Sequence, residues 1–164
     1  MNNKFRVAIF GCGTVGGGVA KILLEIKENI SEKTDREIEL AKIVDLFPMA
    51  SSKRHNIPIE YFCGNNKEQL TKEDANRYIE EILNDPTIDL VVETIGGSSQ
   101  YILDLVLKIL SSKKHLVTAN KALLAKYYNQ IFTKAEENKR AIGFEASVCG
   151  AIPIIKGIKE YSIL

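Results

Sequence analysis

Cysteine, charge of one sign and long apolar runs are all scarce in this sequence. Its 164 residues include three cysteines and carry a formal net charge of +1. Cys12, Cys63 and Cys149 have neither zinc-finger nor CxxC spacing, so they indicate reduced thiols in a cytoplasm rather than a metal or disulfide framework. The near-neutral charge, without a basic stripe, also argues against nucleic acid as a partner.

The sequence also lacks the features of membrane and exported proteins. No apolar run approaches the ~20 residues that a bilayer-spanning helix needs. The segment MNNKFRVAIF has no long apolar core followed by a small-residue cleavage site, so we expect no signal peptide. The length and the ordinary balance of apolar and charged residues suit one globular domain with its own core. We therefore expect a cytoplasmic protein without a membrane partner.

Groups suited to acid–base catalysis are missing as well. His55 lies in a polar stretch and His115 opens a predicted strand, so both are interpreted as structural or surface residues. The carboxylates show no paired catalytic spacing. The sequence therefore leaves the catalytic residues unknown.

What is present is an alternation of short apolar runs with amphipathic segments. Predicted strands cover 5–10, 38–44, 88–97, 115–118 and 141–146, and predicted helices cover 15–30, 72–83, 101–110 and 121–138. A polar, proline-bearing stretch follows the second strand, with a further short strand expected over 59–62. Strands separated by helices favour a parallel sheet covered on both faces, which is a doubly wound α/β fold.

Glycines are concentrated between the first predicted strand and the first predicted helix. Gly11, Gly13 and Gly16 form a G-x-G-x-x-G pattern there. In that context Gly11 permits a tight turn, Gly13 lets a pyrophosphate approach the main chain, and Gly16 lets the helix pack closely on the strand. The helix starting near Thr14 offers N–H groups and the positive end of its dipole to the phosphates. This placement favours a dinucleotide-binding, Rossmann-type sheet over a turn that only joins two elements.

The identity of the dinucleotide depends on residues after the second predicted strand. Asp45 ends that strand, where a carboxylate can accept hydrogen bonds from an adenosine ribose. A carboxylate would repel a 2′-phosphate, which favours NAD. Lys53 and Arg54 could bind the same phosphate, which favours NADP, although a solvated loop is the simpler explanation for them. The cofactor is therefore NAD or NADP.

Other strands also end in glycine or polar residues. Ligands of open α/β sheets bind beyond the carboxyl ends of the strands, so these residues are expected to share one edge. They are Gly11, Asp45, Thr94–Gly97, Thr118–Lys121 and Glu145. Ser98 and Ser99 either contact the ligand or cap the helix that follows.

Four segments together resemble the homoserine dehydrogenase family. They are GCGTVGGGV, VVETIGG, HLVTANKALLA (115–125) and FEASVCGAIPIIK (144–156), and they occur in the family's order along nearly the whole chain. The resemblance implies NAD(P)-dependent interconversion of L-homoserine and L-aspartate 4-semialdehyde, on the route to threonine and methionine. The small-molecule substrate would be one of these two compounds.

The resemblance also assigns roles to individual residues. It places Thr14 and Val15 in the cofactor loop, and Thr94 and Gly96 near the nicotinamide. Lys121 of the T-A-N-K segment becomes a lysine on the cofactor and substrate side. A compact cation at the carboxyl edge of the sheet can reach a phosphate, a ribose hydroxyl or a substrate carboxylate.

A monovalent-cation loop is implied further along the chain. In the family, the position of Glu145 and the carbonyls at Val148, Gly150 and Ile152 ligate sodium. Hard cations prefer oxygen ligands, which such a turn can supply. A plain strand-to-helix turn, with Pro153 beginning the helix and an ordered water in place of the ion, explains the same residues.

The family pattern further divides the chain. Residues 1–148 correspond to the NAD(P)-binding domain, and 149–164 to the truncated start of a catalytic and dimerisation domain. The family carries its catalytic lysine in that later domain, so we expect this lysine beyond Leu164 and an isolated chain that lacks turnover. The full-length protein is expected to form a homo-oligomer. Two alternatives remain, an NAD(P)-sensing module without chemistry and a different semialdehyde reductase.

One thiol stands between the first two glycines of the motif. Cys12 lies beside a helix N-terminus, a position that lowers the pKa of a solvent-accessible thiol and raises its reactivity. The sequence therefore predicts that Cys12 is alkylated readily in the empty protein and is protected by NAD(P). A small filler between strand and helix is the alternative.

Overall fold

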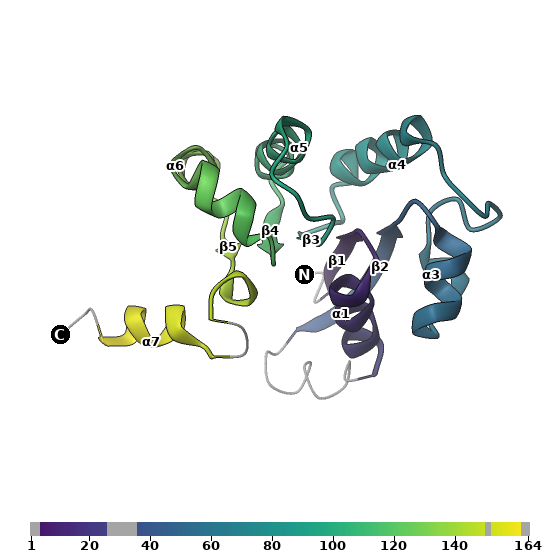
Figure 1. Cartoon of the computed structure of the whole chain (residues 1–164), viewed down its shortest axis with the longest axis horizontal. Coiled ribbons are helices and arrows are strands. Elements are labelled where there is room, and N and C mark those ends of the chain that lie inside the picture. The colour runs from purple at the N-terminus through teal and green to yellow at the C-terminus, as the bar shows by residue number, and fades with distance from the viewer. Residues whose placement is uncertain (1–3, 26–35, 150–151, 162–164) are drawn as a thin grey trace.

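Five parallel strands form a single sheet in the order β2-β1-β3-β4-β5 (Figure 1). The structure is a computed structural model that describes residues 4–25, 36–149 and 152–161. The strands are β1 Lys4–Phe10, β2 Glu37–Val44, β3 Leu90–Glu93, β4 His115–Thr118 and β5 Ile142–Gly143. The helices are α1 Thr14–Glu25, α3 Pro48–His55, α4 Lys72–Asn84, α5 Gln100–Ser111, α6 Lys121–Glu137 and α7 Ile154–Tyr161, with 3-10 turns η1 Ile59–Tyr61 and η2 Glu145–Ser147.

Helices cover both faces of the sheet because the strands are apolar on both sides. In β1, Ala8 and Phe10 pack on the face covered by α4, α5 and α6, whereas Val7 and Ile9 pack on the face covered by α1. Figure 1 shows α4, α5 and α6 along one side of the sheet and α1 with α3 along the other. The expected doubly wound α/β fold is confirmed.

The direction of winding reverses at β1. This strand pairs with β2 on one side and with β3 on the other, so the connections leaving β1 and β2 diverge. At its carboxyl end Phe10 lies opposite both Val44 and Glu93. A crevice opens at such a reversal, and it is where doubly wound sheets bind ligands.

Several predicted elements differ in detail. The stretch expected to be irregular contains α3, which begins with Pro48 in its first turn, a position where a missing N–H costs nothing. The strand expected over 59–62 is the 3-10 turn η1, with only Phe62 bridging to Ile43. The last strand is two residues long, and residues 26–30 of the first predicted helix lie outside the described residues.

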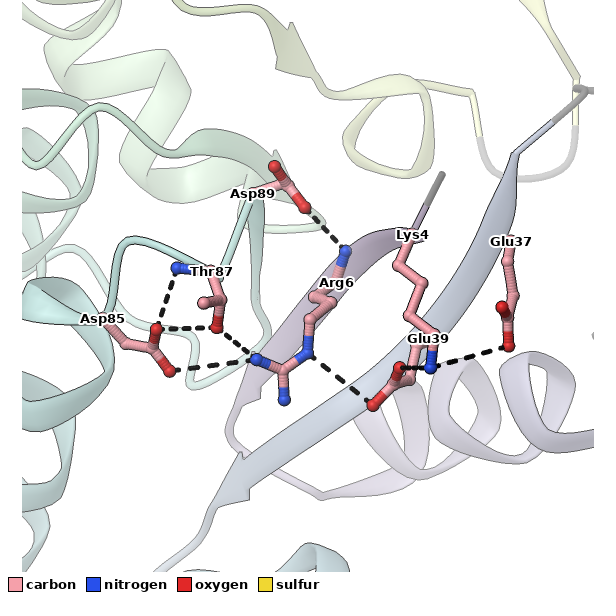
Figure 2. A network of polar contacts seen from close by, with 7 residues as sticks. All are labelled: Lys4, Arg6, Glu37, Glu39, Asp85, Thr87 and Asp89. Carbon is pink, nitrogen blue, oxygen red and sulfur yellow. Dashed lines mark hydrogen bonds and ion pairs between the residues drawn. The ribbon is translucent and has the colours of Figure 1, made fainter. Parts of the chain in front are cut away.

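The amino ends of the strands carry a network of charged side chains centred on Arg6 (Figure 2). The Arg6 guanidinium donates to Thr87 Oγ1 and lies 3.6 Å from a carboxylate oxygen of Glu39. Its backbone N–H donates to Asp89 Oδ2 at 2.8 Å. These contacts join β1, β2 and the loop before β3. No helix in the described ranges is long and apolar enough to cross a membrane.

Candidate functional site

Two glycines of the motif are required by close packing at the carboxyl end of β1. Gly11 has φ +89°, and a Cβ there would lie 2.9 Å from backbone atoms of Thr94 and Ile95. A Cβ on Gly16 would lie 2.0 Å from the carbonyl oxygen of Gly11 and 2.6 Å from Thr94 Oγ1. Both positions therefore exclude side chains for reasons internal to the fold.

Gly13 differs from its neighbours because a Cβ there would meet nothing within 4 Å. Gly13, Thr14 and Val15 are exposed at the N-terminus of α1. The fold does not require glycine at position 13, so its small size leaves open space against the main chain. N–H groups and the positive end of the helix dipole border that space, which suits a phosphate.

Asp45 holds the loop between β2 and α3 against the glycine turn. Its Oδ2 accepts from the backbone N–H of Cys12 at 2.7 Å, and its Oδ1 accepts from Phe47 N–H at 2.8 Å and Ser51 Oγ at 3.0 Å. A carboxylate offers about four acceptor positions, so these three bonds leave one on Oδ2. Asp45 both shapes the loop and retains an acceptor.

A cleft of about 780 Å³ extends from the glycine turn between the β2–α3 loop and helices α4 and α5. It is bordered by Gly11, Gly13, Asp45 and Thr94 at one end, and by Asn76 and Tyr101 at the other. Large apolar side chains stay exposed along it, namely Leu46, Phe47, Ile95 and Tyr101. Such a mixture of apolar surface and a few polar groups is typical of a cofactor or small-molecule site. Lys53 and Arg54 do not line this cleft.

Behind the cleft, a fully buried carboxylate joins two strand ends. Oε1 of Glu93 accepts from the N–H groups of Ile95 and Gly96 at 2.9 and 3.1 Å. Its Oε2 accepts from Thr118 Oγ1 at 2.7 Å. Glu93 is 0% exposed, and these bonds compensate for the burial of its polar atoms. The sequence places Glu93 with Thr94 at the end of this strand, but it does not predict the network that the buried carboxylate forms.

Asn120 extends this network to the start of α6. Its side chain donates to the Gly97 carbonyl at 2.6 Å and accepts from Leu123 N–H at 3.1 Å, which caps the helix. Its own N–H donates to Thr118 Oγ1 at 3.0 Å. The glycine pair after β3 and exposed Lys121, the first residue of α6, are thereby held on the same edge of the sheet. The sequence placed Asn120 in the strand-end segment 118–121 expected at this edge, but it gave this side chain no role of its own.

The known proteins that this chain resembles are homoserine dehydrogenases. The family model described as "Homoserine dehydrogenase, NAD binding domain" matches residues 11–145. Homoserine dehydrogenase from Pseudomonas aeruginosa is 41% identical over 157 residues, and the match covers 94% of this chain and 32% of that protein. The enzyme from Bacillus subtilis is 35% identical, with the same two shares.

The chain belongs to the homoserine dehydrogenase family. A crystal structure of a homoserine dehydrogenase from Thiobacillus denitrificans superposes with a TM-score of 0.76 at 34% identity, over 96% of this chain and 33% of that one. The chain thus spans about a third of the length of the relatives it matches. The matched part is the family's NAD-binding domain.

The segment that the sequence predicts to form a cation loop follows β5. Glu145 lies in η2, and its Oε2 is buried with no hydrogen-bond partner among the described residues. Val148 is half-buried, Ile152 is exposed, and Gly150 lies outside the described residues. The described part of the chain contains no cluster of three or more His, Cys, Asp or Glu side chains, so any ion here would depend largely on carbonyl oxygens.

The prediction for Cys12 is wrong. In this homoserine dehydrogenase domain its side chain is fully buried, and burial, together with the nearby Asp45 carboxylate, raises the pKa of the thiol to about 12. Desolvation disfavours the thiolate more than the helix N-terminus favours it. Cys12 is a small core residue between strand and helix.

Proposed function

We propose that this chain provides the NAD(P)-binding part of an enzyme that interconverts L-homoserine and L-aspartate 4-semialdehyde. Membership of the family supports the reaction, and the open space at Gly13, beside the cleft at the sheet's reversal point, supports the cofactor. We propose residues 1–148 as the cofactor domain and 149–164 as the start of the catalytic and dimerisation domain.

Each residue of the site has a distinct proposed task. The pyrophosphate lies over Gly11, Gly13 and Gly16 against the N-terminus of α1, with Thr14 and Val15 in the same loop. Asp45 accepts from the adenosine ribose through its remaining acceptor position. These residues bind and orient the cofactor, whereas the hydride itself is the cofactor's chemistry.

The nicotinamide side of the site is proposed to lie beyond β3 and β4. Thr94 and Gly96 border the ring, and Lys121 reaches a cofactor or substrate oxygen as a cation. The chain spans about a third of the length of its relatives, and the catalytic lysine is proposed to lie after Leu164. The chain alone is then expected to bind cofactor without oxidising homoserine.

A sodium ion is proposed at the loop after β5, held by Glu145 and by the carbonyls of Val148, Gly150 and Ile152. The orphaned, buried Glu145 Oε2 supports this, because a buried carboxylate oxygen without a partner is unfavourable unless a cation or a donor meets it. We further propose that the whole protein is a cytoplasmic homo-oligomer.

Two valine substitutions test the cofactor assignment. Gly13→Val places a branched side chain in the proposed phosphate space, and we expect calorimetry to show NAD(H) and NADP(H) binding weakened about 100-fold or more, while circular dichroism is unchanged. Gly18→Val is the control, because a Cβ at Gly18 also meets nothing within 4 Å but lies further along α1. If Gly13→Val binds either cofactor as tightly as Gly18→Val does, the loop does not bind pyrophosphate.

A further inference from the structure

A second hollow lies at the opposite edge of the sheet from the glycine turn. Its volume is about 500 Å³, and it is bordered by the ends of α4 and α5 and by the starts of β3 and β4. None of the residues assigned to the cofactor borders it. The residues that border it include Lys113, Lys114, His115 and Arg140.

Within the described part of the chain, no carboxylate forms a direct ion pair with Lys113, Lys114 or Arg140. Arg140 Nε and Nη1 donate to the backbone carbonyls of Asn138 and Lys113, at 3.0 and 3.2 Å. Lys114 is buried, and its ammonium group donates to the carbonyl of Asp85. Exposed Lys113 has no side-chain partner in the described ranges. The direct hydrogen-bond partners of Arg140 and Lys114 are therefore carbonyl oxygens, and the carboxylates of Asp85 and Asp89 favour the charged form of Lys114 from further away.

The nearby acids are already engaged elsewhere. Figure 2 shows Asp85 and Asp89 turned toward Arg6. Asp89 Oδ2 accepts from Arg6 N–H at 2.8 Å, and Asp85 Oδ1 accepts from the N–H and hydroxyl of Thr87. Asp89 is the one carboxylate among the residues that border the hollow.

The C-terminal carbonyl ends of helices α4 and α5 carry partial negative charge, which disfavours an anion in this hollow. α4 and α5 both end at the hollow, and each contributes about half a negative charge. Together with Asp89 and Asp85 they amount to about three negative charges, against four from Lys113, Lys114, Arg140 and the Arg6 that pairs with Asp85. The balance remains positive. Burial lowers the pKa of Lys114 although Asp85 and Asp89 act in the opposite direction, and a bound anion would favour its ammonium form further.

We propose that this hollow binds a small divalent oxyanion, either a phosphate group or a dicarboxylate, between Lys113, Lys114 and Arg140. Ser112 borders the same space and adds a hydroxyl group, whereas the hydroxyl of Ser111, which also borders it, donates to the Leu107 carbonyl at 2.9 Å. Charge-assisted hydrogen bonds of this kind are the strong ones in proteins. Because the site lies on the edge away from the glycine turn, the anion and the dinucleotide bind without displacing one another.

The chain offers a matched pair of lysines for the test. Lys113 and Lys139 are both exposed, and both have positive φ, 61° and 55°, just after α5 and α6. Only Lys113 borders the hollow. Asparagine tolerates this backbone conformation, so Lys113→Asn and Lys139→Asn each remove one charge with little strain.

The experiment is a titration of the 164-residue chain with inorganic phosphate, and separately with succinate, at constant ionic strength. Backbone amide signals of residues 112–115 and 140–141 are followed by NMR, and those of residues 11–17 report separately on phosphate at the glycine turn. We expect saturable shifts at residues 112–115 and 140–141. The affinity derived from these shifts should fall about fivefold in Lys113→Asn and less than twofold in Lys139→Asn.

The two ligands identify the source of the oxyanion. Saturation by phosphate alone assigns a phosphate group, saturation by succinate alone assigns a dicarboxylate, and saturation by both assigns a general oxyanion site. Shifts confined to residues 11–17, or equal weakening by Lys113→Asn and Lys139→Asn, would overturn the proposal.

Discussion

The two edges of this one sheet are built by opposite means. At the carboxyl edge, glycines and a fully buried carboxylate hold the turns, and every acceptor bond of Glu93 is made to neutral N–H or O–H groups. At the amino edge, charged side chains such as Lys4 and Arg6 stay partly exposed and form ion pairs (Figure 2).

The difference follows from what each edge has to do. A dinucleotide brings its own negative charge and needs open backbone, so the carboxyl edge excludes bulk and keeps its carboxylate buried behind the cleft. At the amino edge, ion pairs such as that between Lys4 and Glu39 are partly exposed to solvent, where each contributes little stability. Substitutions should therefore be severe at one edge and mild at the other.

The largest effect is expected for Glu93→Ala. It removes the acceptor for Ile95 N–H, Gly96 N–H and the Thr118 hydroxyl, and leaves these donors in a water-poor site. We expect a loss of about 4 kcal/mol in the free energy of unfolding, measured by urea denaturation. Glu93→Gln keeps one acceptor oxygen and should lose about 1–2 kcal/mol. Equal losses for the two variants would contradict this prediction, because they would show that the shape and the single acceptor oxygen that glutamine retains contribute nothing to stability.

A pair of alanine substitutions in α1 should give the next largest effect. Gly16→Ala forces a methyl group against the Gly11 carbonyl, and we expect about 3 kcal/mol of destabilisation. Gly18→Ala meets nothing within 4 Å and should stabilise the helix by about 0.5–1 kcal/mol. Thermal unfolding of the two variants measures the contrast, and similar melting temperatures would contradict the close packing described at Gly16.

Asp45→Asn tests the boundary between structure and cofactor recognition. The amide keeps one acceptor for the loop but loses the negative charge, so the free energy of unfolding should fall by only about 1 kcal/mol. Calorimetry should show NAD affinity falling more than NADP affinity, because the repulsion of a 2′-phosphate is removed as well. Equal losses for both cofactors would restrict Asp45 to shaping the loop.

At the amino edge, Lys4→Gln should change stability very little. Lys4 lies 3.1 Å from Glu39 and 4.0 Å from Glu37, but its side chain is 46% exposed. We expect at most about 0.5 kcal/mol, falling further as salt is added. A loss comparable with that of Glu93→Ala would remove the distinction between the two edges.

The smallest effect concerns pH. Burial, reinforced by Arg140, lowers the pKa of His115, whose Nδ1 accepts from Ala141 N–H at 3.0 Å. The unfolded chain then binds more protons than the folded chain just below pH 6.5, so stability falls as the pH drops through that value. His115→Asn retains an acceptor and should flatten this part of the profile. An unchanged slope would assign the pH dependence to other groups.

Elements with strong local signals were predicted well. The fourth strand has its predicted bounds, His115–Thr118, and the helix predicted over 72–83 is α4, which ends one residue later. In both segments the apolar residues recur at the spacing of a strand or a helix, and the apolar face that this spacing creates is the face that is buried. The helix α3 was missed because its polar residues 51–54 resemble a loop. Its position depends on packing, with the ring of His55 lying against Gly17.

For the candidate site as well, the parts that depend on local sequence were predicted, and the parts that depend on packing between distant segments were not. The sequence by itself determined the α/β alternation, the glycine turn and the family, because these depend on residue types at short spacing. Only the tertiary structure decided that Cys12 is buried, that Glu93 and Asn120 join two strand ends, and that Lys113 and Arg140 border one hollow. Burial and long-range hydrogen bonds arise between segments far apart in the chain, and local sequence carries no record of which segments will meet.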